Sequence, residues 1–561
     1  MKKTAVLKKR IFFYPVLFVL GILYSLPEFL ITGIQQFPYH DGSFHLSRIL
    51  GLGNVLQSPV SFLNFHHNGL MMNLCYPWLT MYPAYVFYKL TGSCITAYKM
   101  FNCFLTVLTL FLAFDVMREI SENRVSAFCF SVLYAYCSYR FATVFNRAAL
   151  GEVIAMTVWL PVFLGIYHVF FGEEEKWGYL AAGMALFSYT HNLSLMIASV
   201  IIGLMAFVTV WFWDQRKKRI FALVKAAAAA AVLSLGSLVP MFRLFRTDEL
   251  SVPGGSGEWL AESVYDVKTM LLKCLRNEPT FHTVGLLVIA AFFSLCVFYL
   301  IRIIRGTSGK TDKGMNFIAF FGVLILFAVT DLLPWKAIAD RTFLHRMQFA
   351  WRFNVCSVLF ILAAFSYYLP QMIPSEKAEL TAAVLICFLA VGLHLSSRLE
   401  LFRADSSRIL ESDVASGEIV SMDYAPLRAR EYRSEKGLAA LEGILKAGSN
   451  DPVPADVSIS GNGSVYTAVI NLPESPEGTQ MIDLPVFWYT TQDCTLNGEK
   501  ITTSMSERGG TLAMVPSGRT AEIRISYRYT VPARISQAVS AAAAVFFVLL
   551  LIRRRGKTAS A

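Results

Sequence analysis

Long apolar segments separated by short polar ones fill most of the first 400 residues. A helix needs roughly 20 apolar residues to cross the hydrocarbon core of a membrane. The pattern therefore predicts about twelve membrane-spanning helices. They lie near residues 11–33, 94–115, 125–145, 153–171, 178–190, 193–213, 220–243, 283–304, 316–330, 353–369, 379–397 and 534–552. Because the segment 178–190 is short, we expect it to be packed inside the bundle or to extend further.

The pattern changes after about residue 399. Four later stretches alternate apolar with polar side chains and are rich in β-branched and aromatic residues, which is typical of strands. They are residues 465–472, 481–489, 511–515 and 521–529. Asn497-Gly498 is typical of a tight hairpin turn. This part of the chain is therefore predicted to form a small β-rich domain, with a β-sandwich as its expected form.

These patterns predict a polytopic α-helical membrane protein in three parts. Residues 1–398 form the transmembrane bundle, with outer loops at 34–93 and 246–282. Residues 399–531 form the extracytoplasmic β-rich domain, and residues 532–561 form the last membrane helix and a basic cytoplasmic tail.

Composition agrees with a membrane protein. Hydrophobic residues make up 55% of the chain and charged residues 16%, whereas soluble domains average about 25% charged residues. The net charge of +11 does not indicate nucleic acid as a partner, because much of the Lys and Arg lies in clusters beside apolar segments. Most of the ten cysteines lie inside apolar segments and no CxxC pair occurs. Neither a disulfide framework nor a metal site is therefore indicated.

The basic clusters predict the orientation of the bundle. If the basic N-terminus is cytoplasmic, twelve crossings also place the clusters at 216–219, 302–313 and 553–557 on the cytoplasmic side, as the positive-inside rule requires. If residues 70–92 were a further crossing, these basic clusters would lie on the outer side of the membrane. We therefore expect residues 70–92, which are rich in Tyr and Trp, to form helices at the outer interface.

With this orientation, five groups of polar residues come to the outer side, where they predict a polar cavity rather than a channel. The first is the loop at 38–48, in which Asp41, His45 and Arg48 fall at i, i+4 and i+7 of an expected helix. The second group is Arg140 with residues 146–152, which include Arg147 and Glu152, and the third is residues 189–192 with His191. The fourth is the acidic loop 246–282, with Pro253-Gly254-Gly255 as a hinge. The fifth consists of Arg341, His345, Arg346 and Arg352.

Each residue also has a structural interpretation. Asp41 could cap the helix that follows it. His45 and Arg48 could reach toward lipid headgroups, and Arg147 could simply pair with Glu152. His191 could be a packing histidine, while Arg341, Arg346 and Arg352 could anchor lipid phosphates. These interpretations treat each group separately and do not explain why all five converge on one side.

Five short stretches carry a family resemblance. They are residues 41–48 (DGSFHLSR), 76–79 (YPWL), 147–152 (RAALGE), 348–352 (QFAWR) and 484–489 (LPVFWY). In their order and topology the chain resembles the GT-C superfamily of polyprenyl-phosphate-dependent glycosyltransferases. It looks most like the bacterial YfhO-like and "6-pyruvoyl-tetrahydropterin synthase-related" membrane proteins.

The resemblance implies transfer of a sugar from a polyprenyl-phosphate carrier to a cell-envelope glycopolymer or glycolipid, at the outer face of a bacterial cytoplasmic membrane. Asp41 would be the general base of an inverting reaction, and Glu152 a second acid that orients the acceptor or a cation. Phosphate or sugar would be bound by His45, Arg48, Arg147, His191, Arg346 and Arg352. The neighbour of Asp41 is His40 rather than a second acid, so a divalent metal is left open and none is indicated.

Two other functions fit the same sequence. A transporter or flippase for a lipid-linked sugar or polymer would use the same arginines, but internal repeats and interrupted helices, which such proteins often show, are not evident. Alternatively, residues 399–531 could bind carbohydrate or polymer, with the bundle as an anchor. Separately, the chain could be a non-catalytic GT-C relative. An anchor does not need about twelve helices with acids and guanidinium groups gathered on one side.

Overall fold

The computed structural model describes residues 13–559, apart from 38–39, 253, 255, 308–310, 374, 405, 416–418, 420 and 475. Several predicted features lie outside the described residues. They are the basic cluster before residue 11, Pro38 and Tyr39 of the first loop, Pro253 and Gly255 of the hinge, residues 308–310, and the side chains of 554–557.

The chain divides into two compact units, each built from segments far apart in sequence. The first unit takes in the chain up to Gly42, Lys99–Ala231 and Gly254–Arg408. The second takes in Ser43–Tyr98, Val232–Pro253 and the chain from Ile409 onward. The domain boundaries at 398 and 531 stay a prediction.

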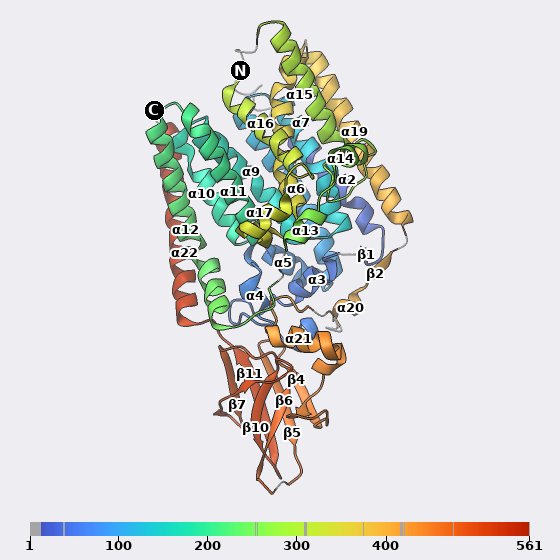
Figure 1. Ribbon diagram of the computed structural model, residues 1–561, viewed down its shortest axis with the longest axis vertical. Helices are drawn as coiled ribbons and strands as arrows, with labels where there is room; N and C mark the ends of the chain where they lie inside the picture. Colours follow the sequence, from blue (N-terminus) through green and yellow to red (C-terminus); the bar gives the residue numbers. More distant parts are fainter. Residues whose placement is uncertain are drawn as a thin grey trace. The chain divides into compact units, whose positions relative to one another are not determined.

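The first unit is helical (Figure 1). Its elements are α2 (Phe13–Phe29), most of α6 (Cys94–Ser121), α7 (Arg124–Tyr136), α8 (Ser138–Phe141), a π-helix (Ala142–Asn146), α9 (Leu150–Phe170), α10 (Gly178–Ser188), α11 (Asn192–Thr209), the first half of α12 (Arg216–Thr247), α13 (Gly257–Glu262), α14 (Val267–Leu275), α15 (Leu286–Ile304), α16 (Lys313–Ala328), α17 (Trp335–Arg341), α18 (Asn354–Met372) and α19 (Glu376–Arg403). Short 3₁₀ turns lie at Glu174–Lys176, Val210–Phe212, Phe343–Met347 and Ala350–Phe353.

Eight helices among the described residues are long and apolar enough to cross a membrane. They are Cys94–Ser121, Leu150–Phe170, Asn192–Phe212, Arg216–Thr247, Leu286–Ile304, Ala350–Met372, Glu376–Arg403 and Val531–Arg553. Two shorter apolar helices are Phe13–Phe29 and Lys313–Ala328. The predicted span 125–145 is broken at Cys137 into α7, α8 and the π-helix, and 178–190 forms the 11-residue α10. A membrane protein with many apolar helices is confirmed, and the count of twelve crossings stays a prediction.

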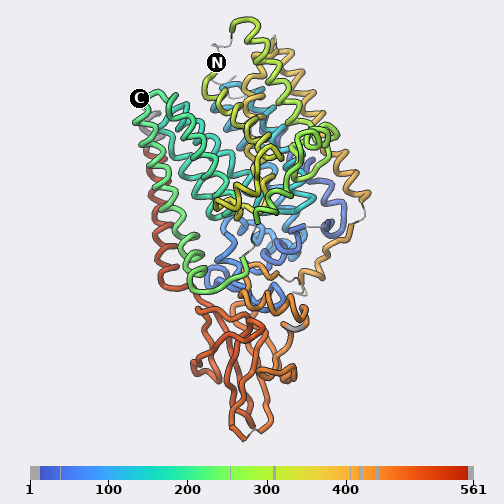
Figure 2. Tube along the Cα trace, viewed as in Figure 1, coloured from blue at the N-terminus to red at the C-terminus, as the bar shows by residue number. Residues whose placement is uncertain are grey.

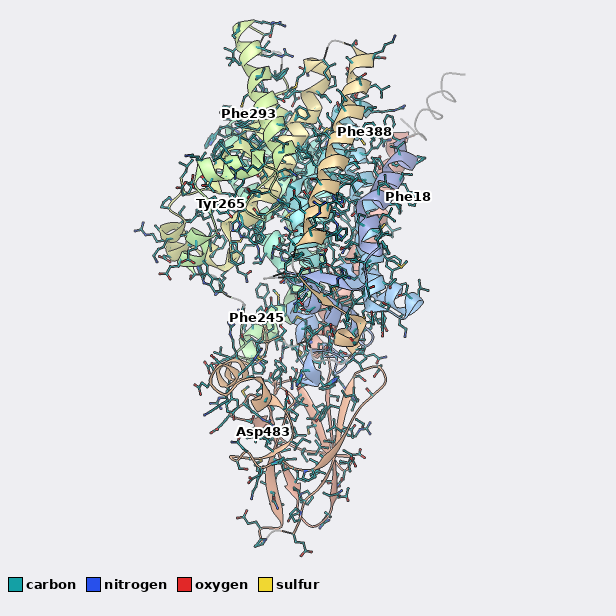
Figure 3. All side chains as sticks on the ribbon, turned by 90° about the vertical axis from the view of Figure 1, so that its right-hand side faces the viewer. Phe18, Phe245, Tyr265, Phe293, Phe388 and Asp483 are labelled. Carbon is teal, nitrogen blue, oxygen red and sulfur yellow. The ribbon has the colours of Figure 1, made fainter. Side chains whose placement is uncertain are left out.

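Burial separates central from peripheral helices in the first unit. In α9 and in the span that contains α18, 89% of the apolar window is buried, whereas in α19 only 22% is. Phe18, Phe293 and Phe388, labelled in Figure 3, are 50%, 49% and 74% exposed on α2, α15 and α19. Large apolar side chains exposed on apolar helices indicate a lipid-facing surface.

The second unit contains the β-sandwich that the alternating pattern predicts. One sheet has the order β3-β6-β10-β9 and the other β4-β5-β11-β7-β8. The strands are β3 (Leu445–Lys446), β4 (Ala455–Ile459), β5 (Val465–Asn471), β6 (Thr479–Leu484), β7 (Gln492–Leu496), β8 (Glu499–Lys500), β9 (Ser504–Met505), β10 (Thr511–Pro516) and β11 (Thr520–Tyr527). Apolar side chains from both sheets, such as Ile482 and Ile523, share one buried core. The predicted strands at 465–472, 511–515 and 521–529 are confirmed, whereas the one predicted at 481–489 ends at Leu484. The outer-face position of the sandwich stays a prediction.

Asn497-Gly498 forms the predicted tight turn between antiparallel strands β7 and β8. Both residues have positive φ angles, +50° and +87°, which is the backbone that a type I′ turn requires. A separate two-stranded sheet pairs β1 (Ile34–Gln36) with β2 (Ser407–Ile409).

Residues 43–98 share their core with the sandwich. They form α3 (Gly42–Leu50), α4 (Met72–Cys75), α5 (Tyr82–Thr91) and 3₁₀ turns at Phe65–His67 and Leu79–Met81. The Asn68 side chain donates to the Pro485 carbonyl at 2.6 Å, and the Met71 amide donates to the Tyr489 hydroxyl at 3.3 Å. The predicted helices within 70–92 are thus present, and their place at a membrane interface stays a prediction.

The remaining helices of the second unit are α20 (Glu411–Ala415), a 3₁₀ turn at Leu438–Leu441, α21 (Leu427–Lys436) and α22 (Val531–Ala559). The apolar α22 runs alongside the C-terminal half of α12, as the tube trace shows (Figure 2). The Ser540 hydroxyl of α22 donates to the Leu233 carbonyl of α12.

Arg508 stabilises the sandwich, and replacing it should be costly. Its guanidinium pairs with Asp483 at 2.9 Å, and its other nitrogens donate to the carbonyls of Glu442, Gly443 and Asp483 (Asp483 is labelled in Figure 3). Arg508→Met would leave a largely buried carboxylate unpaired, which costs about 3–5 kcal/mol of folding free energy. We expect a lower thermal midpoint and faster proteolysis of the sandwich in the full-length protein.

The matched control is Arg524→Met on β11, because Arg524 is exposed. Exposed substitutions usually change the free energy of unfolding by less than about 0.5 kcal/mol. Equal midpoints for the two variants would contradict the assigned role of Arg508.

Candidate functional site

A break between two helices builds the centre of the candidate site. The chain leaves α7 at Cys137 in an extended conformation, forms α8 and the π-helix, and enters α9 at Leu150. The Arg147 amide donates to the Ala142 carbonyl, five residues earlier, at 2.9 Å. Ala148 has a positive φ of +49°, which is strained for a residue with a side chain. π-Helical turns and strained residues of this kind are frequent at functional sites.

The Glu152 carboxylate bridges two arginines. Its Oε2 lies 2.9 Å from Nη1 of Arg147, and its Oε1 lies 3.1 Å from Nε of Arg352. The side chains of Glu152, Arg147 and Arg352 are 10%, 9% and 7% exposed. The predicted pairing of Arg147 with Glu152 is present, and Arg352 is a second partner from a distant part of the chain.

Asp41 adjoins this network at a more open position. Its amide donates to the Arg147 carbonyl at 2.6 Å, and its Oδ2 lies 3.5 Å from Nη2 of Arg147. The Asp41 side chain is 44% exposed, in contrast to Glu152. Because α3 begins at Gly42, Asp41 also occupies the position before the helix that a capping residue takes. The two roles weighed for Asp41 are therefore compatible in space.

Aromatic rings complete the surroundings of Arg147. Its Cζ lies 4.6 Å from the ring centroid of Trp351 and 5.8 Å from that of Phe281, and such cation–π contacts stabilise a desolvated guanidinium. Burial lowers the pKa of Arg147, but the carboxylates of Glu152 and Asp41 outweigh burial, so the pKa is raised overall. Arg147 therefore stays charged, and its charge favours the ionised form of Glu152.

Arg352 lies on the 3₁₀ turn at Ala350–Phe353 and donates from Nη1 to the Met347 carbonyl at 3.2 Å. Glu152, Arg352 and His191 line one small cavity between α9, α11 and α18. His191 contacts the Ser194 hydroxyl through Nδ1 at 2.9 Å. The cavity is also lined by Tyr139, Thr143, Ala155, Met156, Trp159, Ser194, Ile197 and Val355.

Three predicted site residues lie elsewhere. Arg346 is exposed on the 3₁₀ turn at Phe343–Met347. His45 and Arg48 belong to the second unit, where both are buried, which does not fit side chains that reach for lipid headgroups. Arg48 donates from Nη2 to the Pro77 and Tyr76 carbonyls at 2.7 and 3.3 Å, and His45 Nδ1 lies 3.5 Å from its Nη1. Burial lowers the pKa of Arg48 to about 10.

Sequence reasoning missed the roles of Trp351 and Phe281 around Arg147. Trp351 stands directly before Arg352 in the QFAWR stretch, and an aromatic residue next to a buried arginine is a usable signal for cation–π packing. Among the described residues, no group of three or more His, Cys, Asp or Glu is placed to hold a metal ion.

Acidification should destabilise the loop that carries Asp41. His40 Nδ1 accepts a hydrogen bond from the Gly42 amide at 3.1 Å, and burial lowers the pKa of His40 to about 4. A lowered folded-state pKa means that this stability is complete above pH 6.5 and is lost as the pH falls toward 4. We expect the thermal midpoint to fall in this window, and His40→Asn to show a shallower fall.

The control for this experiment is His66→Asn, whose side chain is 23% exposed in the second unit. Burial also lowers the pKa of His282 to about 4, so part of the acid sensitivity will remain in the His40 variant. An unchanged pH profile in that variant would contradict the assignment to His40.

The comparisons with known proteins find likenesses among solved structures. No protein-family model and no curated protein sequence matches the chain. The chain is similar to the crystal structures of ArnT from Cupriavidus metallidurans, one bound to undecaprenyl phosphate and one in the apo state. Each is 12% identical, and each match covers 72% of this chain and 74% of that chain, with TM-scores of 0.39 and 0.38.

Proposed function

We propose that the protein is a membrane glycosyltransferase of the GT-C type, within the YfhO-like group. It would transfer a sugar from a polyprenyl-phosphate carrier to a cell-envelope glycopolymer or glycolipid, at the outer face of a bacterial cytoplasmic membrane. Both termini would then be cytoplasmic, with the sandwich and residues 34–93 and 246–282 on the outer side.

One observation carries this proposal: a half-exposed carboxylate is held against a buried network of ion pairs. Asp41 is 44% exposed, while Glu152 is bridged between Arg147 and Arg352. Because Asp41 is half-exposed and lies beside the Arg147 guanidinium, its carboxylate is placed to accept a proton at an accessible edge. Glu152, with both oxygens in ion pairs, is better suited to hold the arginines in place than to accept a proton.

In the proposed reaction, Asp41 takes the proton from an acceptor hydroxyl as the oxygen attacks the anomeric carbon. The bond between that carbon and the phosphate oxygen breaks, and polyprenyl phosphate leaves with the bonding electrons. The new glycosidic bond forms on the opposite face of the sugar, so the configuration inverts. Arg147 and Arg352 are the cations closest to the two acids, and guanidinium groups suit the charge on the leaving phosphate.

The other proposed binding residues differ in how well their contacts suit that role. His191 lines a cavity of about water-molecule size with Glu152 and Arg352, so in this role it would act beside these two side chains. Arg346 is exposed and accessible to a lipid phosphate. Arg48 donates to two backbone carbonyls, which suits a role in holding α3 and residues 76–77 together, and His45 lies beside it.

The first test is sugar transfer by the purified, full-length protein in lipid vesicles that contain a radiolabelled polyprenyl-phosphate sugar.

A second test identifies the donor and acceptor by mass spectrometry of envelope polymers from cells with and without the protein. We expect polymers from cells that lack the protein to have lost one sugar substituent. Movement of the labelled lipid across the bilayer with no new glycosidic product would contradict transfer and support the flippase alternative.

A further inference from the structure

A second group of buried polar side chains lies in the first unit, where α2, α6, α8 and α19 meet. Three pairs have the i, i+4 spacing that places both members on one helix face. The pairs are Tyr24 and Glu28 on α2, Asn102 and Thr106 on α6, and His394 and Arg398 on α19; Lys99 of α6 and Arg140 of α8 complete the group.

Side-chain contacts join these faces into one cluster. The Tyr24 and His394 rings lie 4.2 Å apart between centroids, and His394 Nε2 donates to the Tyr24 carbonyl at 3.0 Å. Arg140 Nη2 donates to the Thr106 hydroxyl at 3.4 Å. The guanidinium groups of Arg140 and Arg398 both interact electrostatically with Tyr24. The two arginines therefore face the same region from different helices.

The charges within this cluster do not balance. It holds three cations, Lys99, Arg140 and Arg398, but one carboxylate, Glu28, and all four are buried, with Arg140 0% exposed. Arg398 Nη2 lies 3.9 Å from Glu28, beyond hydrogen-bond distance. The network around Glu152 differs, because two arginines there face two acids. Buried charge without compensation is expensive, most of all in an apolar bundle.

Several polar atoms of the cluster have no hydrogen-bond partner among the described residues. They are Nε and Nη1 of Arg140, Nε and Nη2 of Arg398, both amide atoms of Asn102, and the Tyr24 hydroxyl. Most of these atoms are donors. A buried donor without a partner is destabilising, so the arrangement is suited to a ligand that supplies several acceptor oxygens.

We propose that this cluster is a binding site for an oxyanion of the phosphate class. Guanidinium groups recognise phosphate oxygens through paired, charge-assisted hydrogen bonds. A phosphate monoester carries about −1.5 to −2 charges near neutral pH, which matches the excess of positive charge better than a carboxylate does. The inference does not rest on the proposed transfer reaction, because binding requires neither a sugar nor an acceptor.

The test is binding by the full-length protein purified in maltoside micelles, which contain no phosphate. The probes are inorganic phosphate and a polyprenyl monophosphate, and the readouts are the dissociation constant and the rise in thermal midpoint. For the wild type we expect a rise with at least one probe. Arg140→Met should bind about tenfold or more weakly, since a charge-assisted hydrogen bond is lost. Its ligand-free midpoint should equal or exceed that of the wild type, because an unpaired buried charge has been removed.

Arg219→Met is the matched control. Arg219 is also a buried arginine. Unlike Arg140, it donates hydrogen bonds to several backbone carbonyls, among them those of Val169, Gly172 and Asp214. This variant should melt at a lower temperature and keep the full ligand-induced rise.

Two sources of phosphate are distinguished by the probes: a response to inorganic phosphate indicates a free anion, and a response to the lipid alone indicates a headgroup. Either result supports the site. If Arg140→Met does not fold, the Asn102→Leu variant takes its place in the binding test. Both side-chain amide atoms of Asn102 have no hydrogen-bond partner among the described residues, so this variant should show a smaller ligand-induced rise in midpoint. The proposal is overturned if no probe raises the wild-type midpoint, or if the variant that folds keeps the full response.

Discussion

Asp41→Asn is expected to lower the rate of sugar transfer by about 10²–10⁴-fold, which is the usual contribution of a positioned general base. Asparagine has nearly the same shape but cannot accept the acceptor's proton. Folding should be little affected, because the Asp41 side chain is 44% exposed and its 3.5 Å contact with Arg147 resembles a surface ion pair. Such pairs contribute about 0–1 kcal/mol. The measurement is transfer in vesicles at matched levels of folded protein.

The matched control is Asp340→Asn. Asp340 is another aspartate with one cation nearby, Lys336 at 3.2 Å, and its side chain is 49% exposed. This variant should transfer sugar at the wild-type rate. A wild-type rate in the Asp41 variant would remove Asp41 as the base and leave the proposed mechanism without a proton acceptor.

The sequence was most informative where side-chain pattern and backbone geometry are directly linked. Alternation along residues 465–471 and 520–527 places every second side chain in one core, so the strands could be predicted from the pattern alone. Asn497-Gly498 specified its turn for the same reason. The break at Cys137 was not predictable from hydropathy, because 125–145 is apolar on both sides of the polar residues 138–140.

Part of the candidate site could also be predicted. Arg147 and Glu152 are close in sequence at the start of a helix, so their pairing was one of the expected outcomes. The contact between Glu152 and Arg352 joins α9 to a turn before α18. Contacts of this kind depend on how helices pack, which a single sequence does not determine. Placing the polar groups on one side of the membrane limited the candidates without specifying their partners.

The second polar cluster was largely missed because hydropathy averaging hides single polar residues. Glu28, Lys99 and Arg398 lie in or beside segments whose average is strongly apolar. The usable signals were the cost of an ionisable residue at membrane depth and the i, i+4 spacing of Tyr24 with Glu28 and of His394 with Arg398. Arg140 alone was noted from the sequence.

Glu152→Met is expected to lower the free energy of unfolding by about 3–5 kcal/mol, because removing one partner of a buried ion pair leaves uncompensated charge. Here one substitution leaves two buried guanidinium groups without their shared carboxylate. Asp41 compensates only partly, since its oxygen lies 3.5 Å from Arg147, farther than the 2.9 Å between Glu152 and the same arginine. The measurement is the thermal midpoint of the full-length protein. The control is Glu119→Met. Glu119 also bridges two groups, His168 and Lys176, but it is 30% exposed, so this substitution should lower the midpoint less than Glu152→Met does.

The double variant Glu152→Met with Arg352→Met separates charge balance from packing. Replacing a buried ion pair by apolar side chains is often neutral or stabilising, so the double variant should recover most of the midpoint lost in Glu152→Met. Arg147 would then keep Asp41 and the Trp351 ring as partners. If the double variant folds but does not transfer sugar, Arg352 or Glu152 acts in the reaction as well as in the fold. A double variant no more stable than the single one would show that Glu152 stabilises the bundle by some means other than compensating these two arginines.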